Sequence, residues 1–149
     1  MENALDARAT IIEIKLKNFG IDSIEVSDNG SGIEKINYES IALKHCTSKL
    51  GSFSDLASVS SFGFRGEALN ALCELSESFS IVTKTADELV GSSLSFSRSG
   101  ALQQIVPVSR GTGTTVVVSN LFEVLPVRRG EFVRYIFLFI IYSIFSANL

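Results

Sequence analysis

The chain has 149 residues, of which 46% are hydrophobic and 19% charged, and its formal net charge is −3. This length and composition predict one globular domain, or part of one, and exclude a disordered chain. The negative charge gives no electrostatic case for nucleic-acid binding by the whole surface, and the presence of one histidine, His45, excludes a metal cluster built on histidine.

The first residues and the cysteines indicate an intracellular protein. Residues 1–7 resemble neither a signal peptide nor a transit peptide. Cys46 and Cys73 lie far apart in the sequence, which favours two free thiols in a reducing compartment. We therefore expect the protein in the cytosol or the nucleus.

The N-terminal part of the chain predicts a helix followed by a β-hairpin. Residues 1–7 are good helix formers and are typical of the last turns of a longer helix. Residues 12–16 alternate between apolar and charged, which predicts a half-buried strand with one wet face. A second alternating strand at residues 24–26 follows the short turn at residues 18–20, so the two strands should pair antiparallel.

The pattern then changes to helices and loops. The spacing of apolar residues predicts a helix from Ile33 to about Lys44. A polar loop at residues 45–54, a short helix near residues 55–60 and a glycine-containing stretch at residues 61–66 follow. A further helix is expected over residues 66–75.

The second half is mostly strand. Alternation predicts strands at residues 79–83, 89–96 and 102–108, with a turn at residues 98–100 between the last two. The β-branched run at residues 114–118 is typical of a buried central strand. Strands with helices on one side predict an α/β (α+β) two-layer sandwich whose sheet is mixed and mostly antiparallel.

The sequence Ser-Phe-Gly-Phe-Arg-Gly-Glu-Ala-Leu at residues 61–69 is typical of an anion site. Glycines let backbone amides approach an oxyanion, and the N-terminus of the helix that follows adds unsatisfied N–H groups and a partial positive charge. The alternative is a glycine-containing loop before an ordinary core helix.

The sequence Asp-Asn-Gly-Ser-Gly at residues 28–32 ends the second predicted strand. Asp28 at a strand end is placed to accept a hydrogen bond from an exocyclic amine, and the glycines leave room for a flat base. The alternative is a strand-ending turn, because Asp-Asn-Gly is itself a strong turn signal.

Two further positions are candidates. Asn3 is placed to give a carbonyl oxygen to Mg²⁺, or it is a polar residue on the surface of a helix. Thr114 and Thr115 form a hydroxyl pair at the start of a strand, or they reflect β propensity alone.

Together these motifs resemble those of the MutL mismatch-repair ATPases, which belong to the superfamily of gyrase, heat-shock chaperone and histidine kinase ATP sites. The motifs lie at residues 2–7, 28–32, 44–49, 63–69, 113–115 and 125–128. The Lys-His-Cys-Thr-Ser-Lys and Leu-Pro-Val-Arg sequences are most similar to the eukaryotic post-meiotic-segregation (PMS) type. The resemblance runs from Met1 to about Arg134, so we expect a partial ATP-binding domain at residues 1–134.

The resemblance implies the Bergerat-type ATP-binding fold and a site for ATP and Mg²⁺. Asn3 matches the Mg²⁺ ligand, and Asp28 matches the carboxylate that reads adenine. Gly30 and Gly32 match the base pocket, with Thr115 supporting Asp28 and Thr114 beside it. The positions that match the ribose and phosphate contacts, the lid loop and the helix end over the phosphates are Thr47, Ser48, Lys49, Gly63, Phe64, Arg65, Gly66, Glu67, Ala68 and Leu69.

The chain also departs from the family pattern. The family's general base is a glutamate three residues before the position of Glu2, so the resemblance implies an incomplete N-terminus and no catalytic residue in this chain. Such a loss should leave hydrolysis at background, because positioned proton transfer contributes about 10²–10⁴-fold. Arg8 stands where the family has glycine after a helix, a position that often has positive φ.

The last residues do not resemble the family. Residues 135–145 are almost entirely apolar, and as a helix they would span about 16 Å against a hydrocarbon core of about 30 Å. We expect no membrane span and interpret residues 135–149 as an aberrant hydrophobic tail of a truncated gene product. An anchor or a packing helix is the alternative.

The family implies a nuclear protein that pairs with a MutL homologue when ATP closes the lid. Mismatch-recognition proteins and DNA would be partners of the full-length protein and not of this fragment. The alternatives are a non-catalytic interaction module that pairs with a MutL partner and a non-functional gene product. A histidine kinase is disfavoured, because His45 lies in the nucleotide-side loop.

Overall fold

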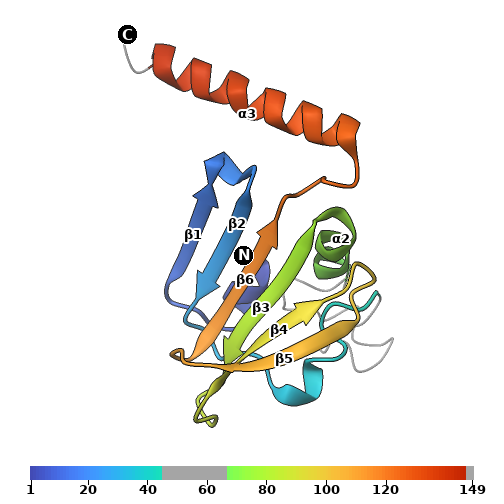
Figure 1. The fold of residues 1–149 in the computed structure, drawn as a ribbon. Coiled ribbons are helices and arrows are strands. Elements are labelled where there is room, and N and C mark those ends of the chain that lie inside the picture. The colour runs from blue at the N-terminus through green and yellow to red at the C-terminus, as the bar shows by residue number, and fades with distance from the viewer. Residues whose placement is uncertain (45–66, 147–149) are drawn as a thin grey trace, which may run out of the picture.

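The structure is a computed structural model that describes residues 1–44 and 67–146. Short helices lie at both ends of the strands, and a long helix ends the described part (Figure 1). In chain order the elements are α1 Glu2–Asp6, β1 Ile12–Lys17, η1 Asn18–Gly20, β2 Ser23–Asp28, η2 Lys35–Asn37, α2 Ala68–Leu75, β3 Ser78–Lys84, β4 Gly91–Phe96, β5 Leu102–Val108, β6 Gly113–Ser119 and α3 Pro126–Ser146.

Six strands form one sheet in the order β1-β2-β6-β3-β4-β5. The β-branched strand β6 lies in the middle, between β2 and β3, as its sequence predicts. The two-layer fold with helices on one face is confirmed (Figure 1). The five strand pairings of the described residues are all antiparallel, so the parallel pairing expected of a mixed sheet is absent from this part of the chain.

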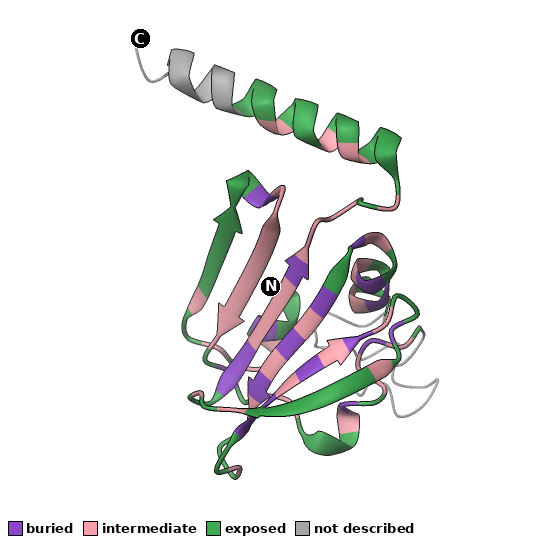
Figure 2. Ribbon diagram, viewed as in Figure 1, coloured by how far each residue is buried: buried purple, intermediate pink, exposed green. Residues whose placement is uncertain are grey.

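The core lies between α2 and the middle of the sheet. Phe79 and Ile81 of β3 are buried, as are Leu94 and Phe96 of β4, and Cys73 of α2 packs against them. The rings of Phe79 and Phe96 have their centroids 5.6 Å apart. Because side chains alternate across a strand, these apolar residues share the face that α2 covers (Figure 2).

Strand β1 does not have the half-buried face that its alternation predicts. Ile14 and Leu16 are 47% and 55% exposed, and five of the six residues of β1 are exposed (Figure 2). The reason is the position of β1 at the sheet edge, where β2 and β6 separate it from the core on β3. The predicted antiparallel hairpin of β1 and β2 is confirmed.

The helix predicted from Ile33 to about Lys44 is wrong for the described residues. Only the 3₁₀ helix η2 and turns are present, with bonds such as Tyr38 N to Lys35 O at 3.2 Å. The apolar spacing was misleading because Ile36 is exposed, whereas Tyr38 and Ala42 are the buried residues.

The helices predicted at residues 1–7 and 66–75 are both present in the structure. Helix α1 is present and ends at Asp6, and Arg8 after it has a φ of 57°, which confirms the positive φ expected there. Helix α2 confirms the helix expected up to residue 75. The predicted loop at 45–54, the helix near 55–60 and the stretch at 61–66 lie outside the described residues.

Helix α3 runs without a break through the expected boundary between residues 134 and 135. Its first turns contact the segment that follows β6: Arg129 pairs with Glu123 at 2.7 Å, and the rings of Phe122 and Phe132 meet edge to face. Among the helices that the structure describes, none has the length and apolar content needed to cross a membrane.

Candidate functional site

The candidate carboxylate, Asp28, is the last residue of β2. It lies opposite Thr114 of β6, and its Oδ1 accepts hydrogen bonds from Gly30 N at 2.8 Å and Thr114 N at 3.3 Å. Both hydrogen bonds from described residues therefore end on one oxygen. These two bonds hold the carboxylate at the strand end.

The two glycines of the turn after β2 are required by close packing. A Cβ on Gly30 would lie 2.7 Å from the Cβ of Ala7, and one on Gly32 would lie 2.2 Å from the carbonyl oxygen of Lys84. Gly32 also has a φ of 77°, which a side chain disfavours. The turn after Asp28 therefore packs directly against the segment that follows α1.

Polar contacts fix the same turn to that segment. Asn29 Oδ1 accepts bonds from Thr10 N and Ile11 N, each at 2.9 Å, and Asn29 Nδ2 donates to Thr10 Oγ1 at 2.8 Å. Ser31 N donates to the carbonyl of Ala7 at 3.0 Å. Helix α1, which carries the candidate metal ligand Asn3 in its first turn, is thus attached to the turn that follows Asp28.

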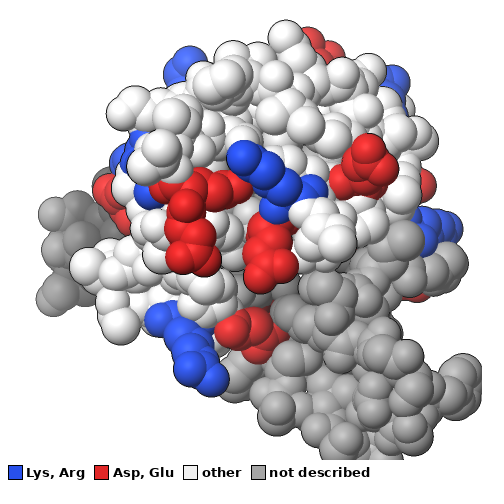
Figure 3. Space-filling model, turned by 90° about the horizontal axis from the view of Figure 1, so that it is seen from below, with Lys and Arg blue, Asp and Glu red and all other residues white. Residues whose placement is uncertain are grey.

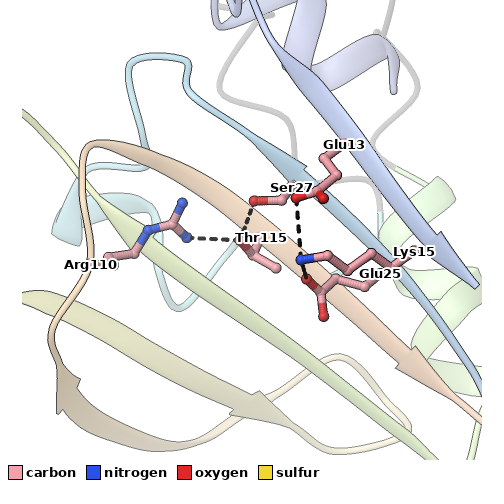
Figure 4. Close-up of polar contacts among 6 residues, drawn as sticks. All are labelled: Glu13, Lys15, Glu25, Ser27, Arg110 and Thr115. Atoms are coloured by element: carbon pink, nitrogen blue, oxygen red, sulfur yellow. Dashed lines mark hydrogen bonds and ion pairs between the residues drawn. The ribbon is translucent and has the colours of Figure 1, made fainter. Parts of the chain in front are cut away.

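The two threonines of the candidate pair lie on opposite faces of β6. Thr114 is buried beside Asp28, and its hydroxyl lies 3.1 Å from the hydroxyl of Thr83. The Thr115 hydroxyl instead bonds to Ser27 Oγ at 2.8 Å, on the sheet face without helices (Figure 4). The structure therefore places Thr114, and not Thr115, next to the carboxylate.

Sequence reasoning missed Thr83. Its side chain is fully buried, and its Oγ1 accepts from Ile33 N at 2.9 Å and donates to Gly113 O at 3.2 Å. The available signal was its alternation with Phe79 and Ile81, which places a hydroxyl on the buried face of β3. Thr83 joins the segment after the glycine turn to the start of β6.

The phosphate side of the predicted site is described only in part. Thr47, Ser48, Lys49, Gly63, Phe64, Arg65 and Gly66 lie outside the described residues. Glu67 and Ala68 are exposed at the start of α2, and Leu69 packs against the core. Asn70, which sequence reasoning also missed, is buried and donates from Nδ2 to the carbonyls of Ala42 at 2.9 Å and Ser99 at 3.1 Å.

Two groups of polar contacts lie on the sheet face without helices (Figure 4). Lys15 Nζ lies 3.2 Å from Glu13 and 3.4 Å from Glu25, and these two carboxylates raise the pKa of Lys15. Arg110 donates to Thr115 Oγ1 at 3.2 Å and to the carbonyl of Val82. Burial lowers the pKa of Arg110, and the charge of Asp28 acts in the opposite direction.

The end of the molecule where β2 terminates carries charges of both signs. Acidic and basic side chains lie next to one another there (Figure 3). Lys35 Nζ lies 3.5 Å from Glu88 Oε1, and the Thr85 amide, together with Lys35, lowers the pKa of Glu88. No group of three His, Cys, Asp or Glu side chains suited to a metal occurs among the described residues.

Two surface concavities lie away from Asp28. The larger, about 810 Å³, is at the opposite end of β2 and is lined by Lys17, Asp22, Ser23, Glu77, Ser78, Val117, Ser119 and Asn120. The smaller, about 380 Å³, is lined by Lys35, Ile36, Tyr38, Glu39, Ser92, Leu102 and Ile105. Neither lining includes a residue of the candidate site.

Comparison with known proteins identifies relatives over most of the chain. Residues 1–110 match the model of the histidine kinase-, DNA gyrase B- and HSP90-like ATPases. Over 134 residues the chain is 53% identical to human mismatch repair endonuclease PMS2 and 52% identical to mismatch repair endonuclease pms1 of Dictyostelium discoideum. These alignments cover 90% of the chain but 15% and 13% of the relatives, so the chain spans about a seventh of their length.

Solved structures show the same fold. The N-terminal domain of a DNA repair protein superposes with a TM-score of 0.75 at 44% identity, over 89% of this chain and 37% of that one. The ATPase domain of Aquifex aeolicus MutL complexed with ADP superposes with a TM-score of 0.58 at 29% identity, over 87% of this chain and 42% of that one.

Proposed function

Since this chain belongs to the family of histidine kinase-, DNA gyrase B- and HSP90-like ATPases and carries part of the ATPase domain of a MutL-type mismatch repair protein, we propose that it binds ATP beside Asp28. The observation that carries the proposal is the position of the Asp28 carboxylate. Gly30 N and Thr114 N hold Oδ1 at the end of β2, which supports a role for the second carboxylate oxygen, Oδ2, as the acceptor for the ligand.

A carboxylate held in this way suits the adenine base. The exocyclic amine of adenine is a hydrogen-bond donor, and an ionised carboxylate is an acceptor without a competing proton. The guanine base has a carbonyl at the corresponding position, and a carbonyl has no hydrogen to donate to a carboxylate. Asp28 therefore favours adenine over guanine nucleotides.

We propose that Asn3 completes the coordination of Mg²⁺ that arrives with the nucleotide. Mg²⁺ keeps several waters and takes one or two protein oxygens together with phosphate oxygens, so it does not require a cluster of carboxylates. The attachment of α1 to the turn after Asp28 supports this role, because it places the helix of Asn3 beside the strand end that holds Asp28. When bound, Mg²⁺ would neutralise charge on the phosphates.

We propose that the other candidate residues also bind ATP. Gly30 and Gly32 form the base-side turn, and Thr114 and Thr115 belong to the strand beside it. For the ribose, the phosphates and the lid we propose Thr47, Ser48, Lys49, Gly63, Phe64, Arg65, Gly66, Glu67, Ala68 and Leu69.

We further propose that the protein acts in DNA mismatch repair in the nucleus, paired with a MutL homologue after ATP closes the lid. The support is the similarity to eukaryotic mismatch repair proteins of the PMS type. Mismatch-recognition proteins and DNA would be bound by the longer protein.

Calorimetric titration with Mg²⁺ and a non-hydrolysable ATP analogue tests the proposal. Asp28→Asn should weaken binding about ten- to a hundredfold, because loss of a charge-assisted hydrogen bond costs about 1.5–3 kcal/mol. Asp22→Asn is the matched control, since Asp22 lies beyond the other end of β2 and should leave affinity unchanged.

Two results would contradict the proposal. Equal affinity of the Asp28→Asn variant and the parent chain would remove Asp28 from the base pocket, and equal affinity for adenine and guanine nucleotides would remove its reading role. A folded chain that binds neither nucleotide would favour the interaction module instead.

A further inference from the structure

Strand β1 lies at one edge of the sheet. In the part of the chain that the structure describes, β1 pairs with β2 alone (Figure 1). Asn29 N donates to the carbonyl of Ile11 at 3.4 Å, so the backbone N–H and C=O groups of residue 11 point towards β2. Because successive backbone groups point to opposite sides of a strand, Ile12, Ile14 and Leu16 direct their N–H and C=O groups to the sheet edge. Such an edge is a template for another strand.

The two faces of β1 differ in chemistry. Ile12, Ile14 and Leu16 share the face on which the helices lie, and Ile14 and Leu16 are about half exposed. Glu13 and Lys15 share the opposite face, where both side chains are exposed and lie 3.2 Å apart (Figure 4). A partner strand must therefore offer apolar residues on one face and a complementary charge pair on the other.

We propose that β1 of a second copy of this chain is that partner, paired antiparallel about a two-fold axis at Ile14. In this register Ile14 of one copy lies opposite Ile14 of the other, and Ile12 lies opposite Leu16. Glu13 lies opposite Lys15, and the two-fold axis repeats this ion pair. The pairing joins the outward-directed backbone groups and aligns the apolar faces.

Charge selects this register from its neighbours. An axis at Glu13 would set Glu13 opposite Glu13, and an axis at Lys15 would set Lys15 opposite Lys15. Like charges directly opposite each other destabilise a strand pair. A shift of one residue would instead place apolar side chains on the charged face. The sequence of β1 is thus complementary to itself in the register centred on Ile14.

The association should be weak and should not require nucleotide. In this register residues 12–16 of the two β1 strands lie opposite each other, and such a short pairing buries less than a standard interface of about 1,600 Å². It also does not involve Asp28, so it is independent of the proposed ATP site.

Sedimentation equilibrium of the full chain without nucleotide tests the proposal, and we expect a monomer–dimer equilibrium. Lys15→Glu creates two like-charge pairs and should raise the dissociation constant at least about tenfold. The triple exchange Glu13→Lys, Lys15→Glu and Glu25→Lys should restore the affinity, because it reverses every pair while keeping the contact between residues 15 and 25. Lys17→Glu is the matched control, since residue 17 lies opposite Ile11 in this register.

Several outcomes would overturn the proposal. They are a chain that stays monomeric at every accessible concentration, equal effects of Lys15→Glu and Lys17→Glu, and association that Lys15→Glu leaves unchanged. If Lys15→Glu leaves association unchanged, the association would be assigned to other exposed apolar residues, such as Tyr135. Circular dichroism checks folding, and if Lys15→Glu does not fold, a folded triple variant that remains monomeric gives the negative result.

Discussion

Asp28 and Thr114 face each other across the pairing of β2 with β6, and the Thr114 amide donates to Asp28 Oδ1 at 3.3 Å. The hydroxyl of Thr114 in turn contacts the hydroxyl of Thr83, which accepts from Ile33 N. The position of the carboxylate therefore depends on a buried polar network that joins β2, β3 and β6.

Thr83→Val should destabilise the fold by about 1–3 kcal/mol. Valine has the shape of threonine but leaves the Ile33 amide without its acceptor in a buried site. Urea denaturation measures the change, with Thr112→Val at an exposed position as the control. An unfolding free energy within about 0.5 kcal/mol of the parent would show that the network contributes little.

Arg8→Gly should raise the unfolding free energy by about 1 kcal/mol. Arg8 N donates to Leu5 O and Ala9 N to Ala4 O, which is the Schellman pattern, and Arg8 has a φ of 57°. A residue with a Cβ is strained there, and glycine is not. Arg8→Ala keeps the Cβ and should show no gain. Equal stability of the glycine and alanine variants would contradict the strain argument.

We propose that residues 135–149 are a tail outside the domain, so deleting them should raise the soluble fraction. Tyr135 and Phe139 are 72% and 70% exposed, and exposed aromatic residues without charge promote aggregation. Light scattering and the yield of soluble chain measure the effect. If the shortened chain loses its circular dichroism signal, the tail belongs to the core.

The Cys73 thiol should resist alkylation in the native state at pH 8. Burial raises its pKa from 9.0 to about 11, so little thiolate is present. Since the folded pKa is the higher one, the stability that this thiol contributes is present below pH 9 and is lost as the pH rises towards 11. The extent of alkylation is measured as the change in intact mass after iodoacetamide treatment. The Cys46→Ser variant is used, with and without urea. Rapid alkylation without urea would contradict the prediction, because it would show that Cys73 becomes exposed in the folded chain.

The sequence predicted the strands well because the alternation of apolar and polar residues shows which side chains share a face of a strand. It failed at Ile36, since three apolar residues with helical spacing did not reveal that Tyr38 and Ala42 would be buried instead. It also overestimated the burial of Ile14 and Leu16, because alternation shows which residues share a face and not whether anything covers that face.

The candidate site shows a similar limit. The turn at residues 28–32 was predicted from its Asp-Asn-Gly sequence, but the choice between Thr114 and Thr115 required the strand register, which places Thr114 opposite Asp28. Thr83 was missed because a threonine in a strand is ordinary, and its role depends on contacts with residues 31 and 50 positions away.

The contacts of Asn29 also affect how fast this residue deamidates. An asparagine followed by glycine readily loses its amide nitrogen when the next backbone nitrogen attacks the side-chain carbonyl. Here Gly30 N is bonded to Asp28, and the Asn29 amide is held by Thr10 and Ile11, so neither reacting atom is free to approach the other. The folded chain is thereby protected from deamidation at this site. In the unfolded chain the attack releases ammonia and forms a cyclic imide, which water opens to aspartate or isoaspartate beside the candidate nucleotide site.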